Sequence, residues 1–297
     1  MKVGIDLGGS HIAVGLVESN GNILSQKEVP ILKEDEKNIC NIIENFITTS
    51  VEEMTEFHKV DEIGLAIPGT VSKTKVIKSV NLGIENYDII GALKGRFNIP
   101  IKIKNDAKCS AIAENTYGSI KQYPNSVFLT IGTGIGGAVT IGHKLICPDN
   151  VPGFEFGHMI IKQNGKLCKC GKRGCFEQYG SMRVFKEKVI EELELDENID
   201  GKKLLEIVRK ELNNPNIARI IDEYTTDLSV GISNLINIFE PEAIGIGGGF
   251  VYYADIFLPI IKDKILNSDL LFNEREDIII NVATLGNDAG IIGATLI

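Results

Sequence analysis

The sequence contains one short pattern twice: a strand-like run, a glycine-rich turn and a second strand-like run. The first copy, IDLGGSHIAVGLV, occupies residues 5–17, and the second, LTIGTGIGGAVTI, occupies residues 129–141. A turn that lacks side chains exposes its backbone N–H groups and lets a ligand approach closely. Because one copy opens each half of the chain, we expect two similarly built domains that face a cleft.

The rest of the chain alternates between strand-like and helix-like periods. In residues 39–54 the apolar side chains recur at spacings of three and four, which predicts an amphipathic helix packed on a sheet. At 297 residues the chain is too long for one small core, so we expect an α/β fold in two domains. Further strands are expected at 23–29, 63–67, 76–80, 101–103, 243–246 and 278–282, and further helices at 89–97, from 106 to 118, from 215 onward, towards 266 and at 288–296.

The charge balance favours small-molecule partners over nucleic acid. The chain has 31 Lys and Arg against 40 Asp and Glu, a net charge of -9, whereas a nucleic-acid-binding surface is normally basic. The first residues lack the apolar region of a signal peptide, and no apolar run reaches the roughly 18 residues of a membrane span. We therefore expect a cytoplasmic protein with no membrane or nucleic-acid partner.

The glycine turns have three possible interpretations. Gly132, Gly134 and Gly137 fit the spacing G-x-G-x-x-G of a dinucleotide site, but that site needs a helix directly after the glycines, and residues 138–141 continue as a strand. Plain tight hairpins and tips that hold nucleotide phosphates both remain. The phosphate-binding hypothesis places Asp6 near a hydrated Mg²⁺, and it places the adenosine at a third glycine run. Its binding residues are Gly8, Gly9, Ser10, Thr133, Gly134, Gly248 and Gly249.

Asp106 stands where a predicted strand gives way to a predicted helix. A helix N-cap is a common use for aspartate at such a position. The alternative is a general base that accepts the proton of a sugar hydroxyl while that hydroxyl attacks the γ-phosphate of ATP. In that case Asn105 would hydrogen-bond the sugar and hold it in register. The residues by themselves leave both interpretations open.

Three of the six cysteines lie within eight residues, at Cys168, Cys170 and Cys175, and His158 lies ten residues upstream. Without a secretory signal, clustered cysteines indicate a metal site or catalysis rather than disulfides. Three thiolates and one imidazole form a closed tetrahedral site, in which zinc is structural. The C-x-C spacing argues against a redox pair, which is typically C-x-x-C.

Two carboxylates flank this cluster. Glu155 lies three residues before His158, and Glu177 lies two residues after Cys175. If zinc fixes both flanks, it also fixes both carboxylates. Acceptors in fixed positions select among sugar hydroxyls, because a polar group left unpaired rejects the wrong substrate. We expect both carboxylates in a sugar pocket.

Eight segments together make the chain recognisable: GIDLGGSHIAVGLV, LAIPGTVS, NDAKCSAIAE, IGTGIGGAV, EFGHM, CKCGKRGCFEQYGS, IGIGGGF and GNDAGIIGA. In their order and across nearly the whole chain they resemble the ROK family of bacterial sugar kinases and repressors. The resemblance implies an actin-like ATPase (ribonuclease H-like) fold, the cofactors ATP, Mg²⁺ and structural Zn²⁺, and phosphorylation of a hexose, usually at the 6-hydroxyl. It also implies a homodimer and domains at 1–117 (with 287–297) and 118–286, the second with a zinc knuckle at 158–175.

The resemblance also assigns residues by position. Asp106 matches the catalytic base, and His158 would both ligate zinc and contact the sugar through its second ring nitrogen. The pair Ser10-His11 stands where threonine is frequent at the first position, and we count His11 among the nucleotide contacts. The sugar contacts implied in this way are Gly69, Asn81, Asn105, Asp106, Glu155, His158 and Glu177.

The sequence allows more than one sugar as the substrate and more than one function. Pro152 and Phe154 stand where glycines are common beside the 2-position of the sugar, so N-acetylmannosamine, N-acetylglucosamine, fructose and allose stay beside glucose. A sugar-sensing repressor would need a helix-turn-helix of roughly 60–80 residues before the first glycine strand. A non-catalytic sugar-binding module would have no need of Asp106.

Overall fold

The computed structural model describes residues 1–9, 11–31, 38–147 and 153–297. By their contacts these residues form two compact units, and each is described by itself. Unit 1 consists of Met1–Gln122, His143–Gly153 and Leu285–Ile297, and unit 2 consists of Tyr123–Gly142 and Phe154–Thr284. The domain boundaries expected from the sequence stay a prediction, because contact density alone does not define a folding domain.

Unit 1 is built on a mixed five-stranded sheet with the order β3-β2-β1-β4-β8. As the first hairpin pattern predicts, β1 pairs antiparallel with β2. It also pairs parallel with β4, which in turn pairs parallel with β8. The strands are β1 (Lys2–Leu7), β2 (His11–Val17), β3 (Ile23–Pro30), β4 (Glu62–Ile67) and β8 (Ile101–Asn105).

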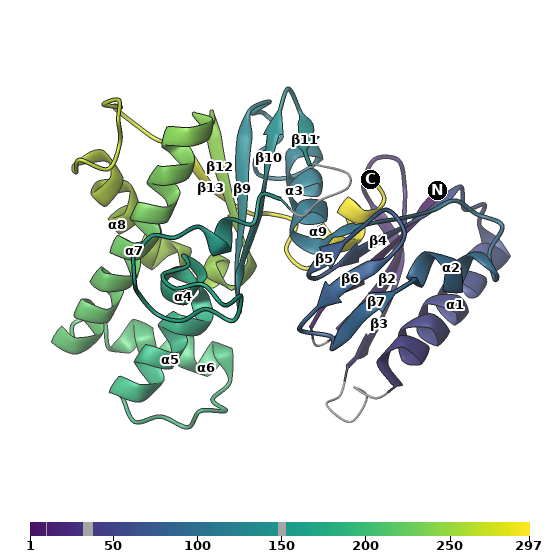
Figure 1. Cartoon of the computed structure of the whole chain (residues 1–297), viewed down its shortest axis with the longest axis horizontal. Helices are drawn as coiled ribbons and strands as arrows, with labels where there is room; N and C mark the ends of the chain where they lie inside the picture. The colour runs from purple at the N-terminus through teal and green to yellow at the C-terminus, as the bar shows by residue number, and fades with distance from the viewer. Residues whose placement is uncertain (10, 32–37, 148–152) are drawn as a thin grey trace. The chain divides into compact units, whose positions relative to one another are not determined.

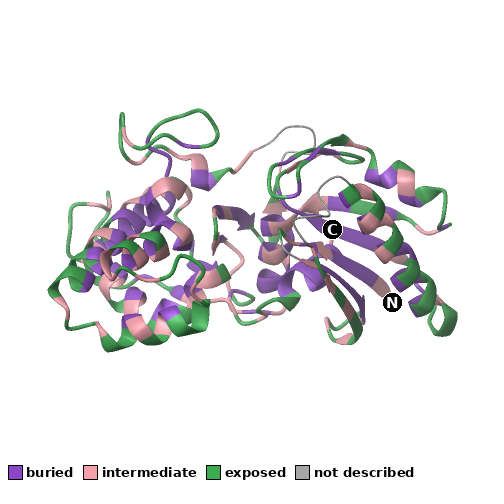
Figure 2. Ribbon diagram, turned by 90° about the horizontal axis from the view of Figure 1, so that it is seen from below, coloured by how far each residue is buried: buried purple, intermediate pink, exposed green. Residues whose placement is uncertain are grey.

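Helices cover both faces of this sheet (Figure 1). On one side α1 (Ile39–Phe57) contacts α2 (Ile89–Lys94), and on the other α3 (Asp106–Thr116) contacts α9 (Asp288–Ala294). Glycines let α9 approach the strands: a Cβ on Gly4 would lie 2.0 Å from the carbonyl oxygen of Ile291, and one on Gly64 would lie 1.6 Å from that of Ala294. The strands β1, β2 and β4 are mostly buried, as the purple ribbon in Figure 2 shows, whereas the edge strand β3 is not.

A small antiparallel sheet with the order β5-β6-β7 follows β4 in the chain. The sequence predicts only its middle strand. The two outer strands are too short to show a period in the sequence. The strands are β5 (Thr70–Val71), β6 (Val76–Ser79) and β7 (Ile84–Tyr87).

Unit 2 repeats the strand pairing of unit 1. β9 pairs antiparallel with β10 and parallel with β12, which pairs parallel with β13. The order β10-β9-β12-β13 thus corresponds to β2-β1-β4-β8, and the repeated sequence pattern forms the first hairpin of each sheet. The strands are β9 (Ser126–Ile131), β10 (Ile135–Ile141), β12 (Ala243–Gly247) and β13 (Ile280–Val282), and a short β11 (Lys144–Ile146) follows β10 in the chain.

The helices of unit 2 surround an apolar core that is rich in aromatic rings. Phe185, Tyr224 and Phe257 pack with ring centroids 5.0 Å apart. The longest helix begins as predicted: Pro215 is its first residue, and the Asn214 side chain accepts from the N–H of Asn216. The helices are α4 (Glu177–Gly180), α5 (Met182–Glu192), α6 (Gly201–Lys210), α7 (Pro215–Phe239) and α8 (Ala254–Leu266), with 3-10 turns η2 (Phe156–His158) and η3 (Gly248–Tyr253).

The fold is therefore α/β with mixed sheets, as expected. One local prediction is wrong: the second glycine turn does not extend to residue 137. The N–H of Gly132 donates to the carbonyl of Gly134 at 2.9 Å, which closes the turn early, and β10 begins at Ile135. Among the described residues, no helix combines the length and the apolar character that crossing a bilayer requires.

Candidate active site and metal centre

The predicted site residues of unit 1 come from one edge of its sheet. β1, β4 and β8 run parallel, with Asp6 opposite Ala66 and Ile67 opposite Asn105. Parallel strands end at the same edge, and open α/β sheets bind their ligands at the carboxyl ends of the strands. Asp6, Gly69 and the pair Asn105-Asp106 are therefore neighbours in space although they are far apart in the sequence.

Asn105, and not Asp106, is the N-cap of α3. Its side-chain oxygen accepts from the N–H of Lys108 at 3.2 Å. Its amide nitrogen donates to the carbonyl of Gly69 at 3.0 Å and to Oδ1 of Asp106 at 2.9 Å. The interpretation of Asp106 as the capping residue is thus wrong. The cap is one residue earlier, and it also holds the Asp106 carboxylate in a fixed orientation.

Asp6 lies close to Asp106, and its carboxyl group is buried. Burial, the nearby charge of Asp106 and the charge of Glu28 raise the pKa of Asp6 from 3.8 to about 7. Its carboxylate packs against the first turn of α9, where a Cβ on Gly290 would lie 2.3 Å from Oδ2. Two acidic groups in one place hold a site for a cation, because a cation would relieve their mutual repulsion.

The first glycine tip follows Asp6 in the chain. The N–H of Gly8 donates to the carbonyl of His11 at 2.9 Å, which closes the turn. A Cβ on Gly8 would lie 2.7 Å from the His11 ring, and one on Gly9 would lie 3.6 Å from Cβ of Asn81. The structure thus places His11, a predicted nucleotide contact, and Asn81, a predicted sugar contact, beside the tip, while Ser10 lies outside the described residues.

In unit 2 the two remaining glycine runs are also neighbours at one sheet edge. β9 and β12 are parallel, and Gly247 lies opposite Thr130. A Cβ on Gly248 would lie 2.7 Å from the carbonyl oxygen of Ile131, and this glycine has a φ of +75° that other residues rarely adopt. Thr133 at the tip and Gly248 are exposed. Exposed backbone N–H groups in glycine-rich turns of this kind are suitable donors for an anion.

Glu177 contacts the second glycine tip directly, which the sequence did not indicate. Its Oε2 accepts from the N–H of Ile135 at 3.0 Å, and a Cβ on Gly134 would lie 2.4 Å from the same oxygen. Glu155 is exposed, and its carbonyl accepts from the N–H of His158 at 3.0 Å in the η2 turn. Of these two predicted sugar contacts, one is therefore bound to the tip and the other is open to solvent.

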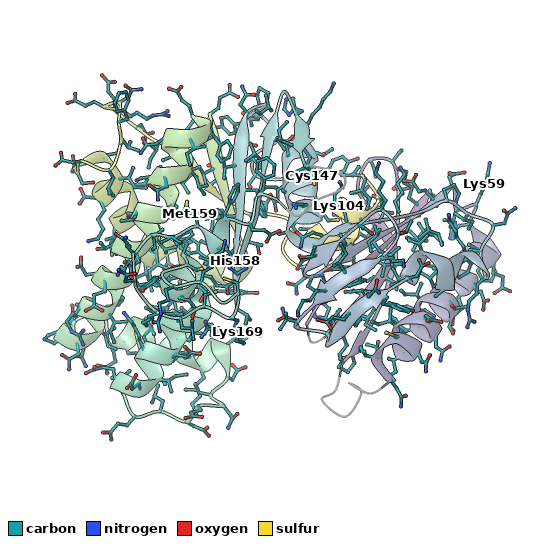
Figure 3. The ribbon with its side chains drawn as sticks, viewed as in Figure 1. Lys59, Lys104, Cys147, His158, Met159 and Lys169 are labelled. Atoms are coloured by element: carbon teal, nitrogen blue, oxygen red, sulfur yellow. The ribbon has the colours of Figure 1, made fainter. Side chains whose placement is uncertain are left out.

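The predicted metal ligands converge within unit 2. The ligand atoms of His158, Cys168, Cys170 and Cys175 all lie within 4.8 Å of one another. Nδ1 of His158 is 3.7 Å from Sγ of Cys168, and Sγ of Cys170 is 3.6 Å from Sγ of Cys175. Figure 3 labels His158 and, on the loop that carries the cysteines, Lys169. Two isolated bridges, Ile160 to Cys175 and Leu167 to Arg173, fold this loop.

These distances fit zinc. With Zn–S bonds of about 2.3 Å and Zn–N bonds of about 2.0–2.1 Å, a tetrahedron has S···S edges of about 3.8 Å and S···N edges of about 3.6 Å. Burial raises the pKa of the Cys175 thiol, and a bound cation would favour its thiolate form. The Gln178 amide lies 3.7 Å from the sulfur of Cys168, where it would orient that ligand.

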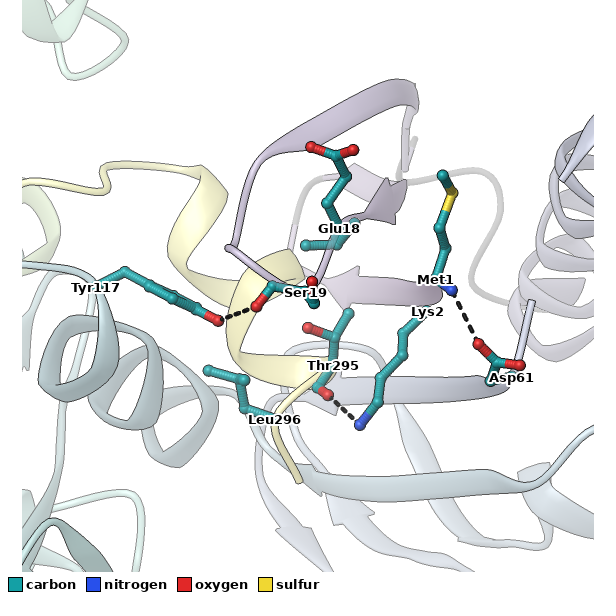
Figure 4. Close-up of a pocket in the computed structure, with 9 residues that line it drawn as sticks. Met1, Lys2, Glu18, Ser19, Asp61, Tyr117, Thr295 and Leu296 are labelled. Carbon is teal, nitrogen blue, oxygen red and sulfur yellow. Dashed lines mark hydrogen bonds and ion pairs between the residues drawn. The ribbon is translucent and has the colours of Figure 1, made fainter. Parts of the chain in front are cut away.

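The structure has a cavity of about 480 Å³ in unit 1, away from these residues (Figure 4). It lies at the start of β1 and the end of β2, beside Lys2 and Val17, whereas Asp6 is near the other end of β1. Lys2 donates to the carbonyl of Thr295 at 2.8 Å across it. This cavity is therefore separate from the candidate active site.

Sequence reasoning missed two supporting residues. Gly290 underlies the Asp6 carboxylate, and Gln178 approaches the metal ligand Cys168. Both belong to segments on which the family resemblance rests, GNDAGIIGA and CKCGKRGCFEQYGS. The signal was present, but a glycine or an amide shows no role until the three-dimensional neighbour is known.

Comparison with known proteins places the chain in a family. The model of the ROK family matches residues 2–297, so this chain belongs to the ROK family. It is 30% identical to a glucokinase of Streptomyces coelicolor, over 99% of this chain and 96% of that protein. It is 27% identical to a xylose repressor of Caldicellulosiruptor bescii, over 98% of this chain and 76% of that protein.

Solved structures give the same result. The structure is similar to the crystal structure of a ROK family glucokinase from Streptomyces griseus in complex with glucose and AMPPNP. The TM-score is 0.82 at 28% sequence identity, and the match covers 99% of this chain and 98% of that one. The family resemblance stated from the sequence is thereby confirmed.

Proposed function

We propose that this chain is an ATP-dependent hexose kinase that transfers the γ-phosphate to a sugar hydroxyl, the 6-hydroxyl first of all. One observation carries the proposal: the Asn105 amide orients the Asp106 carboxylate at the same strand edge that bears Asp6. The chain is a ROK protein similar to glucokinases over its whole length, which supports the same class of reaction.

In this mechanism Asp106 is the general base. The sugar hydroxyl oxygen forms a bond to the γ-phosphorus while the bond from that phosphorus to the bridging oxygen of ADP breaks, and the hydroxyl proton passes to the Asp106 carboxylate. The Asn105 amide keeps the carboxylate in place throughout. Its oxygen caps α3, and a sugar contact would use the remaining lone pair of that oxygen.

The glycine tips would hold the nucleotide. Backbone N–H groups at Gly9, Thr133 and Gly134 would be donors for phosphate oxygens, Gly8 would close the first tip through its bond to His11, and Gly248 and Gly249 would leave room for adenosine. Mg²⁺, bound with ATP, supplies charge neutralisation on the phosphates. Asp6 would hold that ion through water, because its carboxyl group lies close to that of Asp106 and a cation would relieve their repulsion.

The metal centre would be structural. Zinc on Cys168, Cys170, Cys175 and Nδ1 of His158 leaves Nε2 of His158 for a sugar hydroxyl. Glu177 would accept from another hydroxyl with the carboxylate oxygen that does not bind Ile135. Glu155, Gly69 and Asn81 complete the proposed sugar contacts.

The second candidate is a sugar-sensing regulator, favoured by the similarity to the xylose repressor. A regulator would bind a sugar without turnover. The acidic net charge of -9 and the ordered Asn105-Asp106 pair both favour the kinase. We also expect a cytoplasmic homodimer, for which light scattering should give twice the chain mass of 32.5 kDa.

The test is ADP release from Mg-ATP with a panel of glucose, N-acetylmannosamine, N-acetylglucosamine, fructose and allose. We expect turnover with at least one sugar. Asp106→Asn should lower kcat by about 100-fold or more, because a general base contributes about 10²–10⁴. If zinc-loaded wild-type protein binds a panel sugar by calorimetry but releases no ADP, the regulator takes the place of the kinase.

A further inference from the structure

The chain passes from one unit to the other at four points, after residues 122, 142, 153 and 284. Next to each of these points, on the unit 1 side, a backbone or side-chain group is bound by a polar side chain of α3. Three residues of this one helix make the contacts: Lys108, Glu114 and Asn115. Asp106, the proposed base, is the first residue of the same helix.

Glu114 binds two of the four crossings at once. Its side chain is fully buried. Oε2 accepts from the N–H of Ser119 at 2.7 Å, near the first crossing, and Oε1 accepts from the N–H of Leu285 at 2.8 Å, at the last crossing. The fit is tight, since a Cβ on Gly118 would lie 2.1 Å from Oε2.

Two neighbours on the helix bind the other crossings. Oδ1 of Asn115 lies 3.2 Å from Nδ1 of His143, the residue at which the chain re-enters unit 1. Nζ of Lys108 donates to the carbonyl of Gly153 at 3.0 Å, the residue at which the chain leaves it again. Both side chains are buried, at 5% and 7% exposure.

Such burial is expensive unless each polar group finds a partner. An apolar residue would pack α3 equally well, as Ala107, Cys109, Ala111 and Ala113 do at its other buried positions. The polar residues therefore add something that packing alone does not. What they share is that their partners stand at the crossings.

We propose that α3 anchors all four connections, and that Lys108, Glu114 and Asn115 are positioning residues for the phosphoryl transfer. They tie α3 to the places at which the chain leaves and re-enters unit 1, and so hold in position the helix whose first residue is Asp106. This inference rests on the proposed kinase function, and its test separates the two.

The first variant is Glu114→Gln. The glutamine has the same size, but its NH₂ group cannot accept, so only one of the two backbone N–H groups keeps its partner. The control is Ile43→Val or Ile47→Val in α1, whichever lowers Tm by the same amount. Both isoleucines are fully buried in unit 1 and far in sequence from every crossing.

For Glu114→Gln we expect kcat to fall tenfold, with KM for Mg-ATP and for the best sugar of the panel within threefold of wild type. Amide hydrogen exchange at Ser119 or Leu285 should rise tenfold, with no change at Leu65 in β4. The Tm-matched control should keep kcat within twofold. Equal loss of kcat in the variant and the control would overturn the inference, because it would then reflect stability alone.

Lys108→Met provides a second test should the first variant fail to fold. It keeps the apolar stem and removes the ammonium, and the same fall in kcat with an unchanged KM is expected. Normal kcat in the presence of faster exchange would contradict the inference. If wild type turns over no sugar, the kinase proposal fails, and exchange at Ser119 and Leu285 still decides whether Glu114 binds both crossings.

Discussion

At the scale of single residues, the two carboxylates at the edge of unit 1 differ in environment. Asp6 has a pKa of about 7, because burial and the charges of Asp106 and Glu28 oppose its ionisation. Asp106 receives a hydrogen bond from the Asn105 amide, which holds its carboxylate in one orientation. A base must be oriented towards the proton that it accepts, so Asp106 is the better placed of the two.

The raised pKa of Asp6 predicts a pH-dependent stability. The pKa of Asp6 in the folded protein, about 7, exceeds the ordinary 3.8. The contribution of this group to the free energy of unfolding is therefore fully present below about pH 4 and is lost as the pH rises towards 7. Between pH 5 and pH 8 the wild-type protein should lose about 1–3 kcal/mol more of its free energy of unfolding than Asp6→Asn does. Urea unfolding at both pH values, beside the exposed control Asp269→Asn, measures it. A pH dependence that is equal in both variants would contradict the assignment.

The metal ligands give a second prediction. Cys175→Ser should abolish stoichiometric zinc and lower Tm, because the buried Cys175 sulfur is one of four converging ligand atoms. Zinc content after dialysis and competition with a coloured chelator measure the loss. Cys40→Ser, in α1 and outside the cluster, should keep one zinc per chain. Retention of zinc by Cys175→Ser would show that these four residues do not form the site.

At the scale of elements, the sequence predicts most strands and the glycine turns well, since a strand shows an apolar run or a period and a turn shows its glycines. The two hairpins, α1 and the start of α7 lie where the patterns place them. What could not be predicted depends on neighbours distant in the chain. The contact of Glu177 with the Gly134 tip joins residues more than 40 positions apart, and the capping role of Asn105 rather than Asp106 depends on one helical turn of geometry.

The contact of α9 with the sheet makes Gly64 a sensitive position. A Cβ there would lie 1.6 Å from a backbone oxygen, which cannot move away as a side chain can. We expect Gly64→Ala to cost more than about 3 kcal/mol of unfolding free energy. Gly95→Ala is the matched control: Gly95 has ordinary helical φ and ψ with nothing within 4 Å, so alanine should be neutral or stabilising by up to about 1 kcal/mol. Equal Tm values would refute the close approach.

At the scale of the whole molecule, two sheets with the same pairing carry different groups. Unit 1 carries the acidic residues at its strand ends, and unit 2 carries two glycine runs and the metal cluster. The similarity of the two copies is visible in the sequence. The different chemical groups of the two sheets depend on which residues stand at the strand ends.

Sugar binding should stabilise the protein even without catalysis, because a ligand that binds only the folded state favours that state. A sugar present at 100 times its Kd should add about 2.7 kcal/mol, and Tm should rise by several degrees. We expect this rise in Asp106→Ala as well, since that variant removes the base and leaves the other proposed contacts. Differential scanning fluorimetry with the best sugar of the panel, beside sorbitol as an osmolyte control, measures it. An equal shift with sorbitol would exclude specific binding.

The placement of α9 has a consequence for synthesis on the ribosome. Residues Leu285–Ile297 belong to unit 1, yet they are translated after every residue of unit 2. Until they emerge from the exit tunnel, α9 does not cover the face of β1 and β4 at which Gly4 and Gly64 allow its close approach. All of unit 2 must therefore be translated before unit 1 can complete its packing, and the Asp6 carboxylate reaches its final environment only after α9 has been made.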